Sequence, residues 1–258
     1  LGYYLDLGEL DYQIPQHGAD VFGSVLAALP GVDRPTLLDV CCSYGVGGAL
    51  LTTDLSLVDL YKHYRRAGAE GVRGSELAKA DAELLAEHRV ADPPHVIGLD
   101  VAPNAARYAL DAEMLEDVYV ENLEDSRPSE RLARRMDSVD MITTTGGVGY
   151  VTERTFARLL DATDRTPWVA AFCLRAYDYG PVADTLADRG LVTERGARSW
   201  AQRRFRDEAE QTWAMHQVAA NGLDPQELEA DGHYYADFYL SRPAQAAQAQ
   251  PLPALLAA

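Results

Sequence analysis

The chain has 258 residues, 47% of them hydrophobic and 24% charged, which is enough for one soluble α/β domain with a sizeable core. Its formal net charge of −17 argues against nucleic acid as a partner, because a phosphate backbone would be repelled. No apolar run is long enough to span a membrane, and the three cysteines form no disulfide framework, so we expect a cytoplasmic protein without a membrane partner.

The hydrophobic pattern predicts helices and strands that alternate along the chain. A small helix is expected within residues 1–30, starting near Pro15. Strands are expected at 36–40, 95–100, 118–122, 139–144 and 168–174, with two late β segments near 191–206 and 233–241. Helices are expected at 46–51, 56–66, 75–88, 103–112, 129–136, 152–162, 181–188 and 207–219. Ser56, Ser75 and Thr152 are the expected helix caps.

This alternation predicts a mostly parallel sheet with helices on both faces. The two late β segments fit an antiparallel hairpin at one edge of that sheet. The segment after Pro243 is rich in Ala, Gln, Pro and Leu, and we expect it to be a loose end. No internal repeat is present, and no Cys/His spacing indicates a metal site.

Residues 36–49 read Thr-Leu-Leu-Asp-Val-Cys-Cys-Ser-Tyr-Gly-Val-Gly-Gly-Ala, which predicts a buried strand, a tight turn and the start of a helix. This order favours nucleotide binding, because free backbone N–H groups face the ligand at such a turn. The segment resembles the first motif of class I S-adenosylmethionine (SAM) methyltransferases, Leu-Asp-x-Gly-Cys-Gly-x-Gly. Cys41 and Ser43 stand where that family has glycine. They are either a tolerated variation or a sign that the amino-acid part of SAM is held differently.

The resemblance spans roughly residues 30–241 and implies a Rossmann-like class I methyltransferase fold, with a seven-stranded, mostly parallel sheet and an antiparallel edge hairpin. It divides the chain into an N-terminal lid (1–30), a SAM-binding domain (31–243) and a low-complexity tail (244–258). The ribose-binding acid of such folds usually follows the glycine loop by about 20 residues. Here a helical insertion, at about 54–92, lies between the two and is expected to pack near the cofactor mouth.

Asp100 ends the second predicted strand, within Val-Ile-Gly-Leu-Asp-Val, where the family has the acid that binds the ribose hydroxyls. Capping of the next helix is the alternative role. Asn122 ends the third strand and could accept from the adenine amino group, or could serve a turn. Thr145, Gly146 and Gly147 end the fourth strand, where glycines permit close ligand approach or simply make a turn. The residues that the resemblance assigns to SAM are Asp39, Cys41, Ser43, Tyr44, Gly45, Asp100, Val101, Asn122, Leu123, Thr145, Gly146 and Tyr150.

Tyrosines are conspicuous near the expected carboxyl ends of the strands, and a sulfonium cation gains about 0.5–2 kcal/mol over each aromatic face. We expect Tyr177 and Tyr179 to hold the sulfonium, with Tyr12 and His17 closing the site. Packing of these rings in a lid or in the core is the alternative. No basic residue lies near Cys41 or Cys42 in sequence, which argues against a nucleophilic thiol.

Four segments taken together suggest a narrower resemblance: Asp-Tyr-Gln-Ile-Pro-Gln, Cys-Cys-Ser-Tyr-Gly-Val, Asp-Leu-Ser-Leu-x-x-Leu-Tyr and Gly-Gly-Val-Gly-Tyr-Val. They are similar to methyltransferase-like enzymes of bacterial natural-product biosynthesis that use SAM as sole substrate. Those enzymes cyclise its aminocarboxypropyl arm to azetidine-2-carboxylate or aminocyclopropane carboxylate and release methylthioadenosine. This resemblance implies a SAM cyclase. The alternatives are a conventional small-molecule methyltransferase, with a small acceptor as second partner, and a SAM-binding protein without chemistry.

Overall fold

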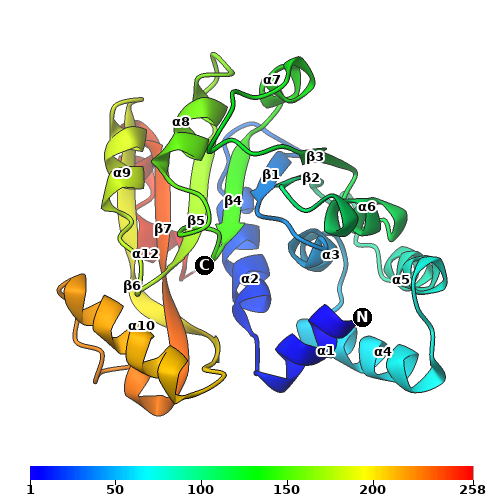
Figure 1. Ribbon diagram of the computed structural model, residues 1–258. Helices are drawn as coiled ribbons and strands as arrows, with labels where there is room; N and C mark the ends of the chain where they lie inside the picture. Colours follow the sequence, from blue (N-terminus) through cyan, green and yellow to red (C-terminus); the bar gives the residue numbers. More distant parts are fainter. Residues whose placement is uncertain (258) are drawn as a thin grey trace.

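The computed structural model describes residues 1–257 and contains one seven-stranded sheet in the order β3-β2-β1-β4-β5-β7-β6 (Figure 1). The first five strands run parallel, and β7 is antiparallel to both β5 and β6. This confirms the Rossmann-like methyltransferase fold with an antiparallel edge pair. The strands are β1 Thr36–Val40, β2 His95–Asp100, β3 Asp117–Val120, β4 Met141–Thr145, β5 Trp168–Leu174, β6 Leu191–Arg204 and β7 His233–Pro243.

All five residues of strand β1 are buried, because the strand pairs with β2 on one side and β4 on the other and helices cover both faces of the sheet. Its Asp39 lies in register with Gly98 of β2 and Thr143 of β4. The carboxyl ends of these three strands therefore meet at one edge of the sheet. In open α/β folds this edge is where ligands bind.

Helices cover both faces of the sheet and bury two apolar clusters against it. The larger cluster takes residues from α1 to α6, and the smaller one takes residues from α7 to α9 (Figure 1). The helices are α1 Gly2–Glu9, α2 Ile14–Ala27, α3 Val46–Thr52, α4 Leu57–Glu70, α5 Ser75–Glu87, α6 Pro103–Asp111, α7 Glu130–Met136, α8 Glu153–Leu160, α9 Gly180–Ala187, α10 Glu208–Ala220, the 3₁₀ turn η1 Glu229–Asp231, α11 Ala244–Ala249 and α12 Leu252–Leu255.

The predicted insertion forms α4 and α5. Ser56 and Asp59 make the predicted reciprocal cap of α4, each side chain accepting from the other residue's backbone N–H. Ser75 is not the cap of α5, because Gly74 with a φ of 59° precedes the helix and Ser75 is its first residue. Residue Asp81 of α5 is buried and joins the insertion to α6. It accepts hydrogen bonds from the hydroxyls of Tyr64 and Tyr108.

The C-terminal segment is not loose, and our expectation for it was wrong. Residues 244–257 contain α11 and α12, and Leu252 and Leu255 are 1% exposed within the larger apolar cluster. Glu194 of β6 accepts from the Leu252 N–H at 2.8 Å and from the Arg242 guanidinium at 2.7 Å. The buried leucines and this buried ion pair fix the segment to the sheet edge.

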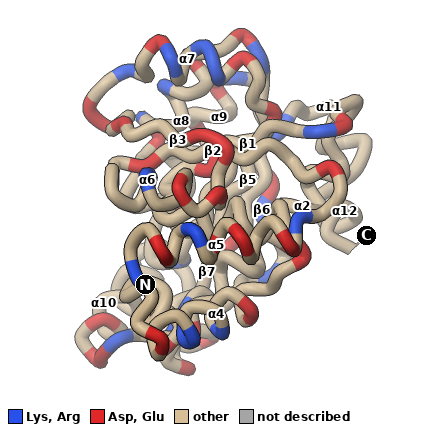
Figure 2. Tube along the Cα trace, turned by 90° about the vertical axis from the view of Figure 1, so that its right-hand side faces the viewer, with Lys and Arg blue, Asp and Glu red and all other residues tan. Residues whose placement is uncertain are grey.

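Acidic and basic residues are interspersed along the exposed faces of α4 and α5 (Figure 2). The sequence has three Arg-Arg pairs, at 65–66, 134–135 and 203–204, and one arginine of each forms an ion pair with an acid: Arg66 with Glu70, Arg134 with Glu130 and Arg203 with Glu210. The first two ion pairs lie on solvated helix faces, and the third joins β6 to α10, so ion pairing accounts for these arginines. Among residues 1–257 no helix combines the length and the apolar character needed to cross a membrane.

Candidate active site

The turn between β1 and α3 keeps a glycine-like backbone without the family's glycines. Cys41 has a φ of 62°, Ser43 a φ of 50° and Gly45 a φ of 80°. A non-glycine residue in this left-handed region costs on the order of 1 kcal/mol, and such strain concentrates at functional sites. Cys41 and Ser43 therefore add side chains to the turn, while its backbone keeps the left-handed conformation at these positions.

Hydrogen bonds to β2 hold this turn in place. The N–H of Cys41 donates to the carbonyl of Leu99 at 2.8 Å, and the N–H of Ser43 donates to Oδ2 of Asp100 at 2.8 Å. The other carboxylate oxygen of Asp100 accepts from the N–H of Ala102 at 2.8 Å, at the entry to α6. Each carboxylate oxygen can accept a second hydrogen bond. Asp100 thus supports the turn and the helix entry and keeps acceptor capacity for a ligand.

Asp39 is a second carboxylate at this edge, buried under α3. Its Oδ1 accepts from the hydroxyl of Thr143 at 3.2 Å, and Oδ2 lies 3.2 Å from where a side chain on Gly47 would begin. Burial and, to a smaller extent, the negative charge of Asp100 raise the pKa of Asp39 to about 7, against the hydrogen bond from Thr143, which lowers it. A cation near both carboxylates would relieve their repulsion.

The two thiols beside the carboxylates are unsuited to nucleophilic chemistry. Burial, together with the charges of Asp100 and Asp39, raises the pKa of Cys41 to about 12. Its sulfur lies 3.0 Å from the position that a Cβ on Gly147 would take. Cys42 is 4% exposed and packs against Gly98 in the core. Both act as packing groups in this structure.

The ends of β2 and β3 present a mixed surface. Val101 follows Asp100 and is 62% exposed, whereas Leu123 is buried. Asn122 makes local turn bonds: its amide donates to Asp125 at 2.6 Å, and its carbonyl accepts from the Glu124 N–H at 3.0 Å. In this structure Asn122 therefore has the turn role that was the alternative to adenine binding, and its side chain is hydrogen-bonded within the turn.

Glu124 is a residue that the sequence reasoning missed. Its carboxylate accepts from Thr152 N–H and hydroxyl at 2.9 and 2.7 Å and from Thr155 hydroxyl at 2.6 Å, which ties the end of β3 to the start of α8. Hydrogen bonds from Thr155 and Thr152 outweigh partial burial and lower the pKa of Glu124, and its charge also acts on Cys41. No sequence motif marks this contact, because its partners lie about 30 residues away in the chain.

The turn after β4 is closely packed. Gly146 has a φ of 91°, and a Cβ on Gly147 would clash with Thr144 and Cys41, so both glycines have a steric reason. Thr145 contacts α2, since a Cβ on Gly18 would lie 2.5 Å from its methyl group. This turn is thus held between the β1 turn and α2.

The predicted N-terminal lid consists of α1, α2 and the strap between them, residues 10–13. The strap pairs with the end of β6: Gln13 N–H donates to Gln202 carbonyl and Arg204 N–H donates to Leu10 carbonyl, both at 2.7 Å. The hydroxyl of Tyr61 on α4 donates to the Tyr12 carbonyl at 2.9 Å. The lid is therefore fastened at both sides.

Tyrosines from the lid lie against the β1 turn. The ring of Tyr3 is 4.9 Å from that of Tyr44, whose other side meets Tyr108 at 5.6 Å. Burial raises the pKa of Tyr3, Ser43 lowers it, and Tyr44 and Asp100 raise it.

Tyr12 and His17 occupy different surroundings. Burial raises the pKa of Tyr12 well above its ordinary value, and Tyr3, Tyr61 and Asp39 raise it further. His17 is half-buried on α2; burial lowers its pKa, and of the nearby charges Asp20 raises it and Arg198 lowers it. Both residues line a cavity of about 420 Å³ that lies between the strap, α2 and α4.

Tyr150, Tyr177 and Trp213, here called the aromatic mouth, gather beyond the ends of β4 and β5. Tyr150 is 83% exposed, Trp213 is 42% exposed, and the rings of Tyr177 and Trp213 are 6.1 Å apart. Tyr177 packs on Gly149, where any side chain would meet its ring at 2.7 Å. Trp213 was not among the predicted residues, because its helix α10 gives no sign in sequence of where it packs.

Tyr179 does not lie in this group. It is 3% exposed in the smaller apolar cluster and stacks on Tyr239 at 4.1 Å with an interplanar angle of 14°. Tyr179 therefore packs in the core, which was the alternative role for these rings. Its position conflicts with our expectation that it holds the sulfonium. Tyr177 lies in the turn after β5, whereas Tyr179 is the N-cap residue of α9 and its ring packs in the core.

Two further observations bound the site. A cavity of about 480 Å³ lies at the other end of β2, lined by residues such as Arg89, Val96 and Met114, and is remote from both carboxylates. Among residues 1–257 no cluster of three or more His, Cys, Asp or Glu side chains is arranged to hold a metal ion.

Comparisons with known proteins agree with the fold. No family model matches the sequence, and no curated protein matches it. Solved structures that resemble it include several methyltransferases. The plantazolicin methyltransferase BpumL in complex with SAH is 9% identical, with 89% of this chain and 85% of that chain covered and a TM-score of 0.46. The TehB-like SAM-dependent methyltransferase of Corynebacterium glutamicum is 15% identical, with 84% and 85% covered and a TM-score of 0.41. The magnesium protoporphyrin IX methyltransferase of Synechocystis, with bound SAM, is 11% identical, with 88% and 79% covered and a TM-score of 0.42.

The sheet order is that of the class I methyltransferase fold. With TM-scores below 0.5, the neighbours add nothing on substrate or chemistry. The basis for a function is therefore the geometry of the two carboxylates, the turn and the aromatic mouth.

Proposed function

We propose that this protein is a SAM-dependent enzyme that methylates a small molecule. The observation that carries the proposal is the left-handed turn from Cys41 to Gly45, bonded to Asp100 through the Ser43 N–H. Strain at two non-glycine residues persists where function needs a particular backbone path. A nucleotide-type ligand at the carboxyl edge of the sheet supplies such a need.

The residues present fit SAM in their charge. Asp39 and Asp100 are two carboxylates beside the turn, and SAM carries an ammonium and a sulfonium cation. Asp100 would accept from the ribose hydroxyls with its remaining lone pairs, and Val101 would cover the adenine ring with its exposed side chain. Asp39, whose pKa is raised to about 7 by burial, would ionise when the cationic end of the ligand lies near it.

The aromatic mouth favours methyl transfer over chemistry on SAM alone. An enzyme that only cyclises its ligand requires no second binding surface, yet Tyr150 and Trp213 present exposed rings beyond the end of β4. SAM supplies an electrophilic methyl group, which a nucleophilic atom of the acceptor takes as the sulfur–carbon bond breaks and S-adenosylhomocysteine remains. The chain contributes orientation, since the packed turn after β4 separates the carboxylates from the mouth.

His17 is the candidate base for an acceptor that must lose a proton. Burial lowers its pKa, so the imidazole is neutral and can accept a proton near pH 7. His17 lines the cavity between the strap, α2 and α4, and it does not line the aromatic mouth. To act as the base, it would need an acceptor that reaches into this cavity. Acceptors that bear a nucleophile without a proton to lose need no base.

Cyclisation of the SAM arm is the second candidate, and one specific observation favours it. Tyr12 lies within range of the Asp39 charge, and Cys41 and Ser43 put side chains on a turn whose backbone is left-handed. A confined arm could be held in a conformation in which its neutral amine attacks its own γ-carbon. Azetidine-2-carboxylate and methylthioadenosine would be the products.

Product analysis separates the two candidates. The purified protein is incubated with SAM alone and, in parallel, with SAM and a small-metabolite fraction, and the products are identified by mass spectrometry. S-adenosylhomocysteine that forms only with the metabolite fraction supports methyl transfer. Methylthioadenosine and a four-carbon cyclic amino acid, formed from SAM alone, would contradict methyl transfer and support cyclisation. If neither SAM nor S-adenosylhomocysteine binds, both proposals fail.

A further inference from the structure

The segment between β6 and β7, residues 205–232 and here called the cap segment, carries Trp213 on α10. Few apolar side chains pack α10 against the rest of the protein, since Ala214 and Val218 are its buried residues. In Figure 1 the cap segment lies apart from the two main helical layers. Polar contacts must therefore supply much of what fixes its position.

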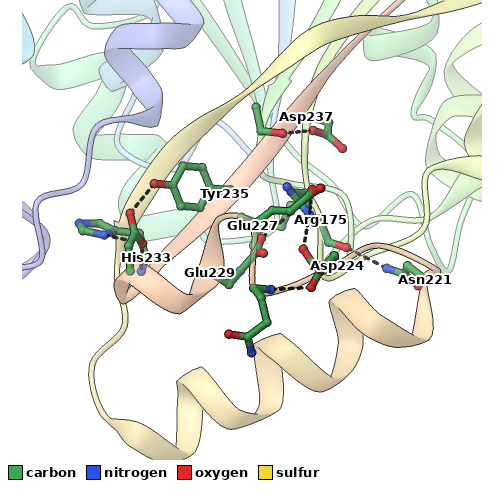
Figure 3. A network of polar contacts seen from close by, with 12 residues as sticks. Arg175, Asn221, Asp224, Glu227, Glu229, His233, Tyr235 and Asp237 are labelled. Atoms are coloured by element: carbon green, nitrogen blue, oxygen red, sulfur yellow. Dashed lines mark hydrogen bonds and ion pairs between the residues drawn. The ribbon is translucent and has the colours of Figure 1, made fainter.

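Arg175, directly after β5, makes several of these polar contacts. It is 5% exposed, and its guanidinium donates to the Asp224 carbonyl at 3.0 Å and lies 3.3 Å from the Glu229 carboxylate (Figure 3). The Arg175 carbonyl accepts from the side-chain amide of Asn221 at 2.9 Å. Its N–H donates to the Tyr235 carbonyl at 2.9 Å, so one residue joins β5, β7 and the cap segment.

Glu229 depends on Arg175 for its charge. It is 1% exposed, and within residues 1–257 neither carboxylate oxygen has a hydrogen-bond partner. Its backbone carbonyl accepts from Gln211 of α10 at 3.1 Å, which links the pair to the helix of Trp213. A buried carboxylate is strongly destabilising once its cationic partner is removed.

The same short turn connects this ion pair to the aromatic mouth. Tyr177 follows Arg175 by two residues, and its ring meets Trp213 at 6.1 Å. The backbone after β5 and the helix α10 are thus joined twice, once by charge in the interior and once by rings at the surface. A shift of the cap segment would separate the two rings.

We propose that the buried pair of Arg175 and Glu229 positions the cap segment so that Trp213 stands against Tyr177, where the acceptor binds. Arg175 and Glu229 are positioning residues and touch no reacting atom. That the acceptor binds at the aromatic mouth rests on the proposed methyl transfer. The role of the ion pair is a separate claim about geometry, which can be tested without an acceptor.

The test uses the three tryptophans of the chain, labelled as 5-fluorotryptophan and followed by ¹⁹F NMR. Trp168 and Trp200 are 6% and 5% exposed in the core and serve as internal references. The variants are Arg175→Met and Glu229→Gln, and Arg66→Met removes an exposed arginine as the matched control. Amide hydrogen exchange of α10 and calorimetric SAM affinity are measured on the same samples.

In Arg175→Met we expect the Trp213 resonance to move while those of Trp168 and Trp200 stay in place. In Glu229→Gln, exchange in α10 should quicken by at least about fivefold, because a contact to a charged group is replaced by a neutral one. SAM affinity should change by less than about threefold in either variant, since the carboxylate site shares no partner with the pair. Arg66→Met should change none of the three.

An unchanged Trp213 resonance in Arg175→Met, or unchanged α10 exchange in Glu229→Gln, would overturn the inference. If Arg175→Met does not fold, all three resonances move together, and the milder Glu229→Gln then decides by its exchange and its Trp213 signal. Failure of the wild-type protein to bind SAM would overturn the proposed function alone. The position of Trp213 would still decide the inference about the ion pair.

Discussion

The N–H of Ser43 donates to Oδ2 of Asp100 at 2.8 Å and so connects the turn after β1 to the end of β2. Ser43 has a φ of 50°, which an L-residue adopts at a cost, and this hydrogen bond helps to hold it there. The carboxylate proposed to receive the ribose therefore also keeps the turn in shape. Ligand binding and turn geometry share one side chain.

Ser43→Gly should stabilise the protein, because glycine reaches the left-handed region without the steric cost of a Cβ. The gain is the relieved strain minus the larger backbone entropy of glycine in the unfolded chain, about 0.5–1 kcal/mol in the free energy of unfolding. Urea unfolding measures it. SAM affinity should be maintained, because the donor is the backbone N–H. A loss of stability would show that the serine side chain holds the turn.

Gly45→Ala is the matched opposite within the same turn. Gly45 has a φ of 80°, and its added Cβ would lie 2.7 Å from the Cβ of Met114. We expect a loss of about 2–3 kcal/mol in the free energy of unfolding, from strain and overpacking together. Urea unfolding under the same conditions gives the comparison, and a neutral result would contradict the packing described at this position.

SAM affinity should depend on pH through Asp39. Burial raises its pKa to about 7, so below that pH the free protein holds Asp39 protonated, and a bound cation favours the ionised form. Affinity should therefore fall by up to about tenfold per pH unit on going from about pH 7 to about pH 5.5. Calorimetry at several pH values measures this slope. Asp39→Asn should bind SAM more weakly and lose the slope, and an unchanged slope in that variant would assign it to another group.

Stability in the absence of ligand should run the other way. The folded-state pKa of Asp39, about 7, exceeds its unfolded value of about 3.8, so the folded state holds the proton more tightly. The contribution of Asp39 is present below about pH 4 and is lost as pH rises to about 7, up to about 4 kcal/mol in all. Comparing urea unfolding of the wild type and Asp39→Asn across this range isolates it. A difference between the two that does not depend on pH would contradict the raised pKa.

Tyr179→Phe should leave both stability and turnover close to those of the wild type. The Tyr179 ring stacks on Tyr239, and its buried hydroxyl has no hydrogen-bond partner within residues 1–257, so removing the hydroxyl costs at most about 0.5 kcal/mol. Tyr179→Ala should cost about 3–5 kcal/mol through the cavity it leaves. Thermal unfolding and product formation are measured on both. A large loss of turnover in Tyr179→Phe with normal stability would contradict this packing role and show that the hydroxyl takes part in catalysis.

The strands and the β1 turn could be predicted because their signals are local. Buried runs such as residues 168–174 read directly as strands, and the Ser56–Asp59 cap of α4 needs only neighbouring residues. The edge pair of β6 and β7 followed from two β segments in succession. Positive φ at Cys41 and Ser43 could not be read from these residue types, which rarely adopt it.

Side-chain destinations could not be predicted where they depend on distant partners. Tyr177 and Tyr179 look equivalent in sequence, yet Gly149 receives one ring and Tyr239 the other. Leu252 and Leu255 lie in a segment of low complexity, and their burial depends on the edge of the sheet. Arg175 and Glu229 are more than 50 residues apart, and nothing local pairs them.

Calorimetric titration of SAM into the wild-type protein and into Asp100→Asn tests the central claim most directly. One SAM should bind per chain, and the affinity should fall by about ten- to a hundredfold in the variant, since one charged acceptor at the ribose and the support of Ser43 are both weakened. Asp111→Asn, at the far end of α6, is the control and should match the wild type. Absence of binding heat in the wild type, or equal affinity in Asp100→Asn, would contradict the assignment of this turn and carboxylate to SAM.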